Sequence, residues 1–277
     1  MARGAHLKIL AAISPCPNDV FIFGGILSGA VLEPGDSNFE FAFHDVETLN
    51  LEVQAGLWDL SKISYANYPY CSDRYRLLHC GGALGRGCGP LLLSNRSGWD
   101  PEAEVLVPGQ YTTANFLLDF CFPDTTLRKV FLPFDQLYRR LLSPEPCQGV
   151  VIHEMRFTYA ADGLHLIQDL GEFWEWKTSH PIPLGAVALR NDFVVANPGI
   201  ASQIESIIRR SLDWAYAHPE PALALCRQYS HSSSEDVLKA HIDLYVNEFS
   251  RELGSEGDAA VAYFLASHRR LHASTST

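Results

Sequence analysis

The sequence predicts an α/β protein made of two lobes, each built on a β-sheet, with a ligand cleft between the lobes. Short aliphatic and aromatic runs alternate with helical patterns between residues 7 and 190, and only helical patterns follow. The 277 residues, 47% of them hydrophobic, are enough to form two hydrophobic cores. We expect residues 1–100 and 190–277 to form the first lobe and residues 101–189 the second.

Composition and charge restrict the class of partner. The formal net charge is −11 and basic residues do not cluster, which argues against nucleic acid or an anionic membrane as a partner. No run approaches the roughly 20 apolar residues of a membrane span. The seven cysteines show no zinc-type spacing, which is typical of a reducing compartment. Residues 7–13 run directly into two prolines without a cleavage motif, so we expect a first strand rather than a signal peptide, and a cytoplasmic location.

The first part of the chain predicts three strands, each followed by a helix. We expect the strands at 7–13, 39–44 and 59–65, and the helices at 18–31, after Asp45 with Leu49, Val53 and Leu57 on one face, and at 66–76. Ser14, Asn18 and Asp19 offer capping side chains at the first helix, whose N-terminus is a potential anion site. Five glycines between residues 77 and 93 indicate a backbone that closely approaches a ligand or another segment.

The second part of the chain continues this alternation and then becomes helical. We expect strands at 104–107, 128–132, 150–152 and 182–189, helices from Thr112 and over 134–142, and a short helix or loop at 171–178. Prolines beside the strand at 182–189 indicate either a hinge crossing or an edge strand. Of the C-terminal helices, one is expected to be capped by Asn197-Pro198 and one by a capping box over 232–235, and residues 272–277 are expected to be disordered.

His153 is the candidate catalytic residue, because it follows the buried aliphatic run from Val150 to Ile152. Ligands of open α/β sheets bind beyond the carboxyl ends of such strands. A neutral imidazole there could act as a general base. The alternative is a histidine whose ring is satisfied by a backbone carbonyl at a strand end. Strand alternation directs Glu154 to the opposite face, away from the imidazole.

Lysine and hydroxyl side chains are the candidates for substrate binding. Lys62 and Ser64 share one face of a strand, and Lys62 could bind a substrate carboxylate, extend to solvent or form a salt bridge. Thr112 and Thr113 either cap a helix or contact an anionic ligand. The residues expected to form the site are Ser14, Asn18, Lys62, Ile63, Ser64, Thr112, Thr113 and His153.

Other kinds of site are not indicated by the sequence. The segment from Gly85 to Gly89 lacks the spacing of a dinucleotide-binding or phosphate-binding loop, and no serine elbow is present. Asp, Glu and His show no metal-type spacing. The sequence therefore predicts a site without cofactor or metal, in which one base, one cation and several hydroxyl groups act on a small carboxylate substrate.

Six blocks of sequence form a recognisable set: Ser14 to Asp19, Asp45 to Asn50, Leu84 to Leu91, Pro108 to Ala114, Ile152 to Tyr159 and Pro181 to Gly185. Together, and in this order, they resemble the 1,4-dihydroxy-6-naphthoate synthases of the futalosine route to menaquinone. Each block alone is a weak signal, whereas the set in this order is specific.

The resemblance implies a fold like the type II periplasmic binding proteins, with a mixed sheet in each lobe, and a reaction without cofactor. It implies that His153 is the proton acceptor, and that Lys62 to Ser64 and Thr112-Thr113 contact substrate. The family converts cyclic dehypoxanthine futalosine to 1,4-dihydroxy-6-naphthoate and dihydroxyacetone. Val20 stands where a threonine is expected, which could alter specificity. The alternatives are a cytoplasmic solute-binding or sensory module of the same fold, and chorismate dehydratase, a related enzyme on that fold.

Overall fold

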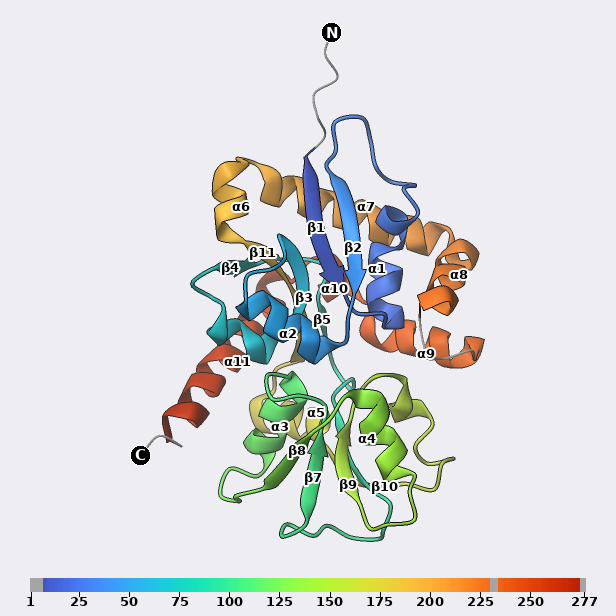
Figure 1. Cartoon of the computed structure of the whole chain (residues 1–277), viewed down its shortest axis with the longest axis vertical. Coiled ribbons are helices and arrows are strands. Elements are labelled where there is room, and N and C mark those ends of the chain that lie inside the picture. Colours follow the sequence, from blue (N-terminus) through green and yellow to red (C-terminus); the bar gives the residue numbers. More distant parts are fainter. Residues whose placement is uncertain (1–6, 230–233, 275–277) are drawn as a thin grey trace.

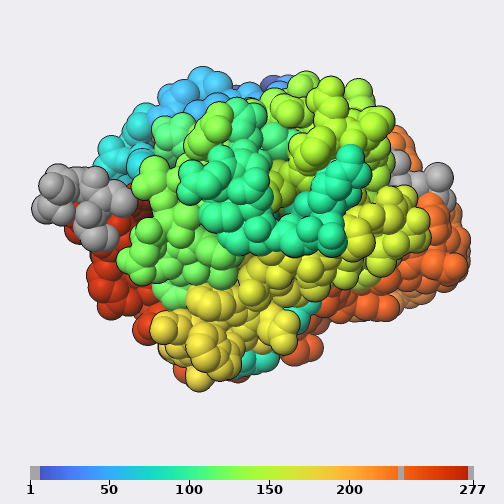
Figure 2. All heavy atoms as spheres, turned by 90° about the horizontal axis from the view of Figure 1, so that it is seen from below, coloured from blue at the N-terminus to red at the C-terminus, as the bar shows by residue number. Residues whose placement is uncertain are grey.

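The computed structural model describes residues 7–229 and 234–274, which form two lobes, each built around one mixed β-sheet (Figure 1). The first lobe contains the N-terminal and C-terminal parts of the chain, and the second contains the middle part, drawn mainly in green. Seen from the end of the second lobe, these middle segments cover most of the surface, with the blue and red ends of the chain at its margins (Figure 2). The α/β class and the mixed sheets predicted from the sequence are confirmed.

The sheet of the first lobe has the strand order β2-β1-β3-β11-β4, and β5 also pairs with β11. Its strands are β1 (Lys8–Ile13), β2 (Asn38–Phe43), β3 (Leu60–Ser64), β4 (Tyr75–Leu77), β5 (Ala83–Gly85) and β11 (Ile182–Arg190). β1 runs parallel to β2 and β3, whereas β11 runs antiparallel to β3, β4 and β5. β11 therefore lies inside the sheet, and the edge-strand alternative for this segment is wrong.

The sheet of the second lobe has the strand order β10-β6-β9-β7-β8. Its strands are β6 (Leu91–Ser94), β7 (Glu104–Val107), β8 (Arg128–Phe131), β9 (Gln148–Val151) and β10 (His165–Asp169). β9 is buried along its whole length, parallel to β7 and antiparallel to β6. The strand that leads to His153 is thus buried, as the aliphatic run predicts, and lies in the centre of the sheet.

The chain passes from one sheet to the other twice, between β5 and β6 and again before β11. These crossings lie earlier in the chain than the predicted lobe limits of 100 and 189. An aliphatic run such as β6 or β11 indicates a buried strand but does not indicate which sheet the strand joins. The division into domains at those limits stays a prediction. The segments at Gly89 and Gly171 touch, since a Cβ added to Gly89 would lie 2.2 Å from the Gly171 Cα. This contact is a close backbone approach of the kind that the glycines indicate.

Helices cover both sheets and connect the lobes. They are α1 (Pro17–Leu27), α2 (Val46–Gln54), α3 (Thr113–Cys121), α4 (Phe134–Leu141), α5 (Leu170–Thr178), α6 (Asn191–Ala196), α7 (Ile200–Ala217), α8 (Pro219–Tyr229), α9 (Glu235–Tyr245), α10 (Glu248–Arg251), α11 (Gly254–Ser274) and the 3-10 helices η1 (Tyr65–Tyr70) and η2 (His153–Phe157). α1 packs on α7, α8 and α9, and α9 also packs on η2 of the second lobe. Within the described ranges, none of the helices is sufficiently long and apolar for a membrane span.

Several local predictions differ from the structure. The helix predicted over 66–76 is wrong, because η1 ends at Tyr70 and β4 follows; Pro69 lies inside η1 and has no N–H to extend a helix. α1 ends at Leu27 rather than at residue 31. Leu57 lies beyond α2 and is exposed, so it does not continue the apolar face of that helix.

The predicted ends of the C-terminal helices differ as well. Asn197-Pro198 does not cap α7, because Gly199 is its N-cap residue and Asn197 instead follows the last turn of α6. The predicted capping box over 232–235 begins outside the described residues. The predicted disordered tail begins too early, since α11 continues to Ser274; residues 275–277 lie outside the described ranges.

Candidate active site

A cavity of about 120 Å³ lies between the two lobes and is lined by all eight residues predicted to form the site. The first lobe contributes Ser14, Asn18 and the β3 residues 62–64, and the second contributes Thr112, Thr113 and His153. The interlobe cleft and the common location of these residues are therefore as predicted. Their roles in binding and catalysis stay predictions.

The N-terminal turn of α1 holds a buried carboxylate. α1 begins at Pro17, and Cys16 in extended conformation is its N-cap residue, without a side-chain cap. The predicted capping role of Ser14 and Asn18 is therefore wrong, because both side chains bind Asp19 instead. Ser14 Oγ donates to Asp19 Oδ2 at 2.7 Å, and Asn18 Nδ2 donates to Asp19 Oδ1 at 3.0 Å.

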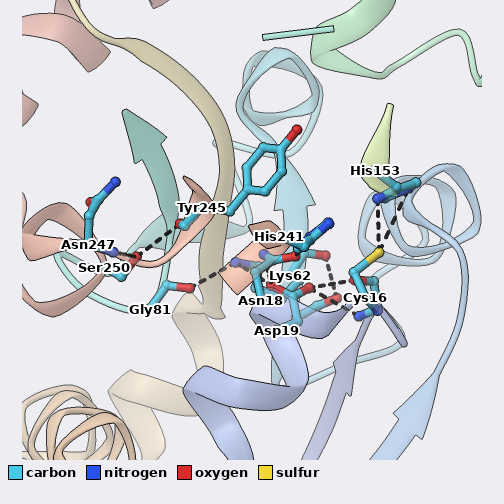
Figure 3. Close-up of polar contacts among 12 residues, drawn as sticks. Cys16, Asn18, Asp19, Lys62, Gly81, His153, His241, Tyr245, Asn247 and Ser250 are labelled. Carbon is cyan, nitrogen blue, oxygen red and sulfur yellow. Dashed lines mark hydrogen bonds and ion pairs between the residues drawn. The ribbon is translucent and has the colours of Figure 1, made fainter. Parts of the chain in front are cut away.

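Lys62 forms the buried salt bridge that was one of its predicted alternatives. Its Nζ lies 2.9 Å from Asp19 Oδ1 and donates to the carbonyl oxygen of Gly81 at 2.8 Å, and the two charged side chains are 6% and 4% exposed (Figure 3). The extension of Lys62 to solvent is excluded by this burial. Because the negative charge of Asp19 offsets its positive charge, Lys62 is not an isolated cation in the cavity.

Ser64 and Ile63 are held at the end of β3. The backbone N–H of Ser64 donates to Asn50 Oδ1 at 2.9 Å, and Asn50 Nδ2 lies 3.2 Å from Ser64 Oγ. Asn50, which is fully buried on α2, was not predicted and fixes the orientation of this serine. Val20 is buried in the core of the first lobe and does not line the cavity, so its side chain is not directed toward a ligand there.

Thr112 and Thr113 begin α3 at the opposite side of the cavity. Thr112 Oγ1 accepts from the backbone N–H of Asn115 at 3.2 Å, which confirms the capping alternative. Thr113 Oγ1 donates to the carbonyl oxygen of Leu184 at 2.8 Å, a contact between the lobes. Both hydroxyls are thus used within the protein, and the N-terminal end of α3 remains the feature of this segment that favours an anion.

His153 follows β9 and lies at the edge of the cavity with an unusual backbone. Its φ is +62°, in the left-handed region that few non-glycine residues adopt and that is often found at functional sites. Its ring packs edge-on to Phe134, with 4.9 Å between ring centroids. This backbone turn directs the imidazole from the second lobe toward the N-terminus of α1 in the first.

Cys16 contacts the His153 ring across the cavity. Its Sγ lies 3.0 Å from Nδ1 and 3.8 Å from Nε2 (Figure 3). Burial, followed by the negative charges of Asp19 and Glu154, raises the pKa of the Cys16 thiol well above its usual range. The cysteine is therefore an uncharged S–H group at neutral pH and not a thiolate nucleophile.

The prediction that Glu154 and His153 point to opposite faces assumes that both residues belong to a strand, and this assumption is wrong. Both residues lie in η2, beyond the end of β9, so the twofold alternation of a strand does not apply to them. Glu154 is buried, and it does not line the cavity.

Two cavity residues on α9 were not predicted. His241 and Tyr245 are four residues apart, so they share one face of the helix, and their rings lie 4.5 Å apart. Their spacing of four residues can be read from the sequence, and it places both side chains on one face of a helix. Nothing in the sequence pattern, however, indicates that α9 reaches the cleft.

The fold and the interlobe cavity define the class of protein. At 13% identity the chain is similar in fold to a Candida albicans protein whose structure exhibits the generic periplasmic binding protein fold (TM-score 0.67, covering 97% of this chain and 90% of that chain). Residues 9–270 match the model of a family described as menaquinone biosynthesis. The chain belongs to this family of enzymes.

Two relatives carry a more specific name. The chain is 42% identical over 258 residues to a 1,4-dihydroxy-6-naphtoate synthase of Thermus thermophilus, covering 91% of each chain. It is 38% identical over 255 residues to a protein of the same name from Streptomyces coelicolor, covering 90% of this chain and 89% of the relative. The region that matches the family, residues 9–270, extends through both lobes and contains the positions of all the residues that line the cavity.

Proposed function

We propose that the protein is a carbon–carbon lyase that converts cyclic dehypoxanthine futalosine to 1,4-dihydroxy-6-naphthoate and dihydroxyacetone. The observation that carries this proposal is the position of His153, which lies in the interlobe cavity together with the predicted substrate-binding residues of both lobes. The names of the two relatives support the same reaction. The reaction takes place in the cytoplasm and uses no cofactor.

In the proposed mechanism, His153 is the general base. Its unprotonated ring nitrogen takes the proton of a substrate hydroxyl, whose oxygen–hydrogen electron pair becomes part of a new carbonyl group. The adjacent carbon–carbon bond breaks in a retro-aldol step, its electron pair passes to the departing three-carbon fragment as an enolate, and the imidazolium returns the proton to that fragment to give dihydroxyacetone. The carbonyl group left on the ring enolises to an aromatic hydroxyl. Atoms and electrons balance without water, oxidant or reductant, and formation of an aromatic ring favours cleavage.

The substrate carboxylate is held at the side of the cavity opposite His153. The N-terminus of α3, which begins with Thr113 after the Thr112 cap, offers partial positive charge and backbone N–H groups. Ser64, oriented by Asn50, offers a hydroxyl from the first lobe. Lys62 contributes indirectly, because its salt bridge with Asp19 fixes the N-terminal turn of α1 in the first lobe. Binding from both lobes orients the substrate relative to His153.

The test is product formation by the purified protein. Incubation with cyclic dehypoxanthine futalosine is expected to release 1,4-dihydroxy-6-naphthoate, which is followed by its fluorescence, and dihydroxyacetone in equal amount. A parallel incubation with chorismate is expected to give no dehydration product. Tight binding of cyclic dehypoxanthine futalosine without turnover would indicate a binding module, and turnover of chorismate alone would indicate the dehydratase; either result contradicts the proposal.

A further inference from the structure

His241 is a buried histidine in the cavity that the proposed mechanism does not use. It lies on α9, is 1% exposed and lines the cavity together with His153. α9 packs directly against η2, the short helix that begins with His153. Both histidines therefore face the same ligand volume from different lobes.

The hydrogen bonds of the neighbouring residues determine which His241 nitrogen carries the proton. Both oxygens of the Asp19 carboxyl group face donors, since Lys62 Nζ lies 2.9 Å from Oδ1 and Ser14 Oγ donates to Oδ2 at 2.7 Å. Asn18 must therefore present its amide nitrogen to Asp19 Oδ1, at 3.0 Å, and its Oδ1 to the Nε2 atom of His241, also at 3.0 Å. Because an amide oxygen cannot donate, the His241 Nε2 must carry the hydrogen (Figure 3).

The other nitrogen of this ring, Nδ1, is consequently an acceptor. Burial, and next the nearby His153, lower the pKa of His241 to about 3, so the ring is neutral at physiological pH. The Nδ1 atom is buried and has no hydrogen-bond partner among the residues that the structure describes. Its aromatic neighbours, the rings of Tyr245 and Phe157, lie 4.5 and 6.4 Å away between centroids. A buried polar atom without a partner is rare in folded proteins and requires a specific explanation.

We propose that the Nδ1 atom of His241 accepts a hydrogen bond from a hydroxyl group of the bound substrate. This inference rests on the proposed function and adds a specificity-determining contact to it. A carboxylate or carbonyl oxygen placed at Nδ1 would oppose one lone pair to another, so the position selects a hydrogen-bond donor, which a hydroxyl group of the proposed substrate can supply. His241 has a different role from His153, because a ring with a pKa near 3 is too weak a base to remove a proton at neutral pH.

Two substitutions separate the two nitrogens of His241. In His241→Gln, the side-chain amide can still donate to Asn18 from near the Nε2 position, but the acceptor at Nδ1 is lost. In His241→Asn, an amide oxygen can occupy the Nδ1 position, so this variant is expected to restore part of the effect. His218→Gln is the matched control, since His218 is an exposed histidine on the surface of the first lobe.

The kinetic test combines these variants with substrate analogues in which one hydroxyl at a time is replaced by hydrogen. We expect kcat/KM of His241→Gln to fall about tenfold, which corresponds to about 1.4 kcal/mol. The analogue that lacks the contacted hydroxyl should lose a similar factor with the wild-type protein and little more with His241→Gln. His218→Gln should behave as wild type with every substrate.

A second measurement does not depend on the folding of a His241 variant. The variant His153→Asn, which is expected to turn over substrate slowly, is labelled with ¹⁵N-histidine. It should show the His241 Nδ1 resonance as unprotonated, and saturation with substrate should shift this resonance as expected for a new hydrogen bond. Two results would overturn the inference. One is a His241 Nδ1 resonance that does not shift at saturation; the other is a set of kinetic data in which every analogue lowers kcat/KM by the same factor in His241→Gln as in the wild-type protein. Absence of naphthoate from the wild-type protein would instead refute the proposed function, and the inference with it.

Discussion

The salt bridge between Lys62 and Asp19 allows the sharpest stability prediction. The two side chains are 6% and 4% exposed, so solvent does not screen the interaction, and no other cation replaces Lys62 among the bonds that the structure gives to Asp19. Lys62→Met leaves a buried carboxylate without its counter-charge, and it also removes the donor to Gly81 O. Breaking a buried pair in this way costs about 3–5 kcal/mol.

Urea unfolding, followed by tryptophan fluorescence, measures this loss. We expect Lys62→Met to lower the free energy of unfolding by about 3–5 kcal/mol, whereas Lys62→Met combined with Asp19→Asn should recover about 2 kcal/mol of it, because the unpaired charge is then removed. The control is Lys8→Met, since the Lys8–Glu40 pair is 61% and 63% exposed and should contribute less than about 1 kcal/mol. A Lys62→Met protein that unfolds within about 1 kcal/mol of wild type would refute the reasoning.

Three further predictions concern pH, the lobe crossing and the thiol beside His153. Burial lowers the pKa of His241 to about 3 and of His268 to about 4; the unfolded imidazoles bind protons that the folded ones exclude, so the free energy of unfolding should fall as pH decreases from about 6.5 to 4. His268→Gln should reduce the slope, measured by urea titrations at several pH values, by up to about 1.4 kcal/mol per pH unit, and an unchanged slope would contradict this. Gly89→Ala should destabilise by at least about 1–3 kcal/mol in the same assay, because its Cβ would lie 2.2 Å from the Gly171 Cα; a neutral effect would show that the crossing is loose. Cys16→Ala should lower kcat about tenfold through loss of the 3.0 Å contact to His153, with Cys16→Ser closer to wild type, and equal rates for all three proteins would argue against a positioning role.

The sequence predicts best what short-range physics determines. Three aliphatic residues are enough to indicate that the strand before His153 is buried, and the hydroxyl of Thr112 is enough to indicate a helix cap. The helix predicted over 66–76 is wrong, because the sequence pattern there does not distinguish a helix from a short 3-10 helix followed by a strand. The contacts of η1 and the pairing of β4 with β11 determine the structure of this segment.

Long-range contacts account for the rest. Lys62 is recognisable as an unusual buried lysine, but its partner Asp19 is 43 residues away in the sequence and was interpreted as a helix cap. His241 is 223 residues from Asn18, and no periodicity connects them. The position of β11 in the first sheet likewise depends on pairing with β3, which a strand pattern does not encode. The resemblance to a family indicated some of the residues around the cavity, namely Lys62 to Ser64, Thr112, Thr113 and His153, but not the hydrogen bonds that fix their orientation.

The role of His153 as general base is the central claim, and the rate of naphthoate release by His153→Asn tests it most directly. Asparagine adopts positive φ more readily than most residues, so this variant is compatible with the backbone at φ +62° while it removes the imidazole. We expect unchanged unfolding by urea, substrate binding within a few fold of wild type, and kcat lower by about 10²–10⁴-fold. A folded His153→Asn protein that releases 1,4-dihydroxy-6-naphthoate at the wild-type rate would contradict the proposed mechanism.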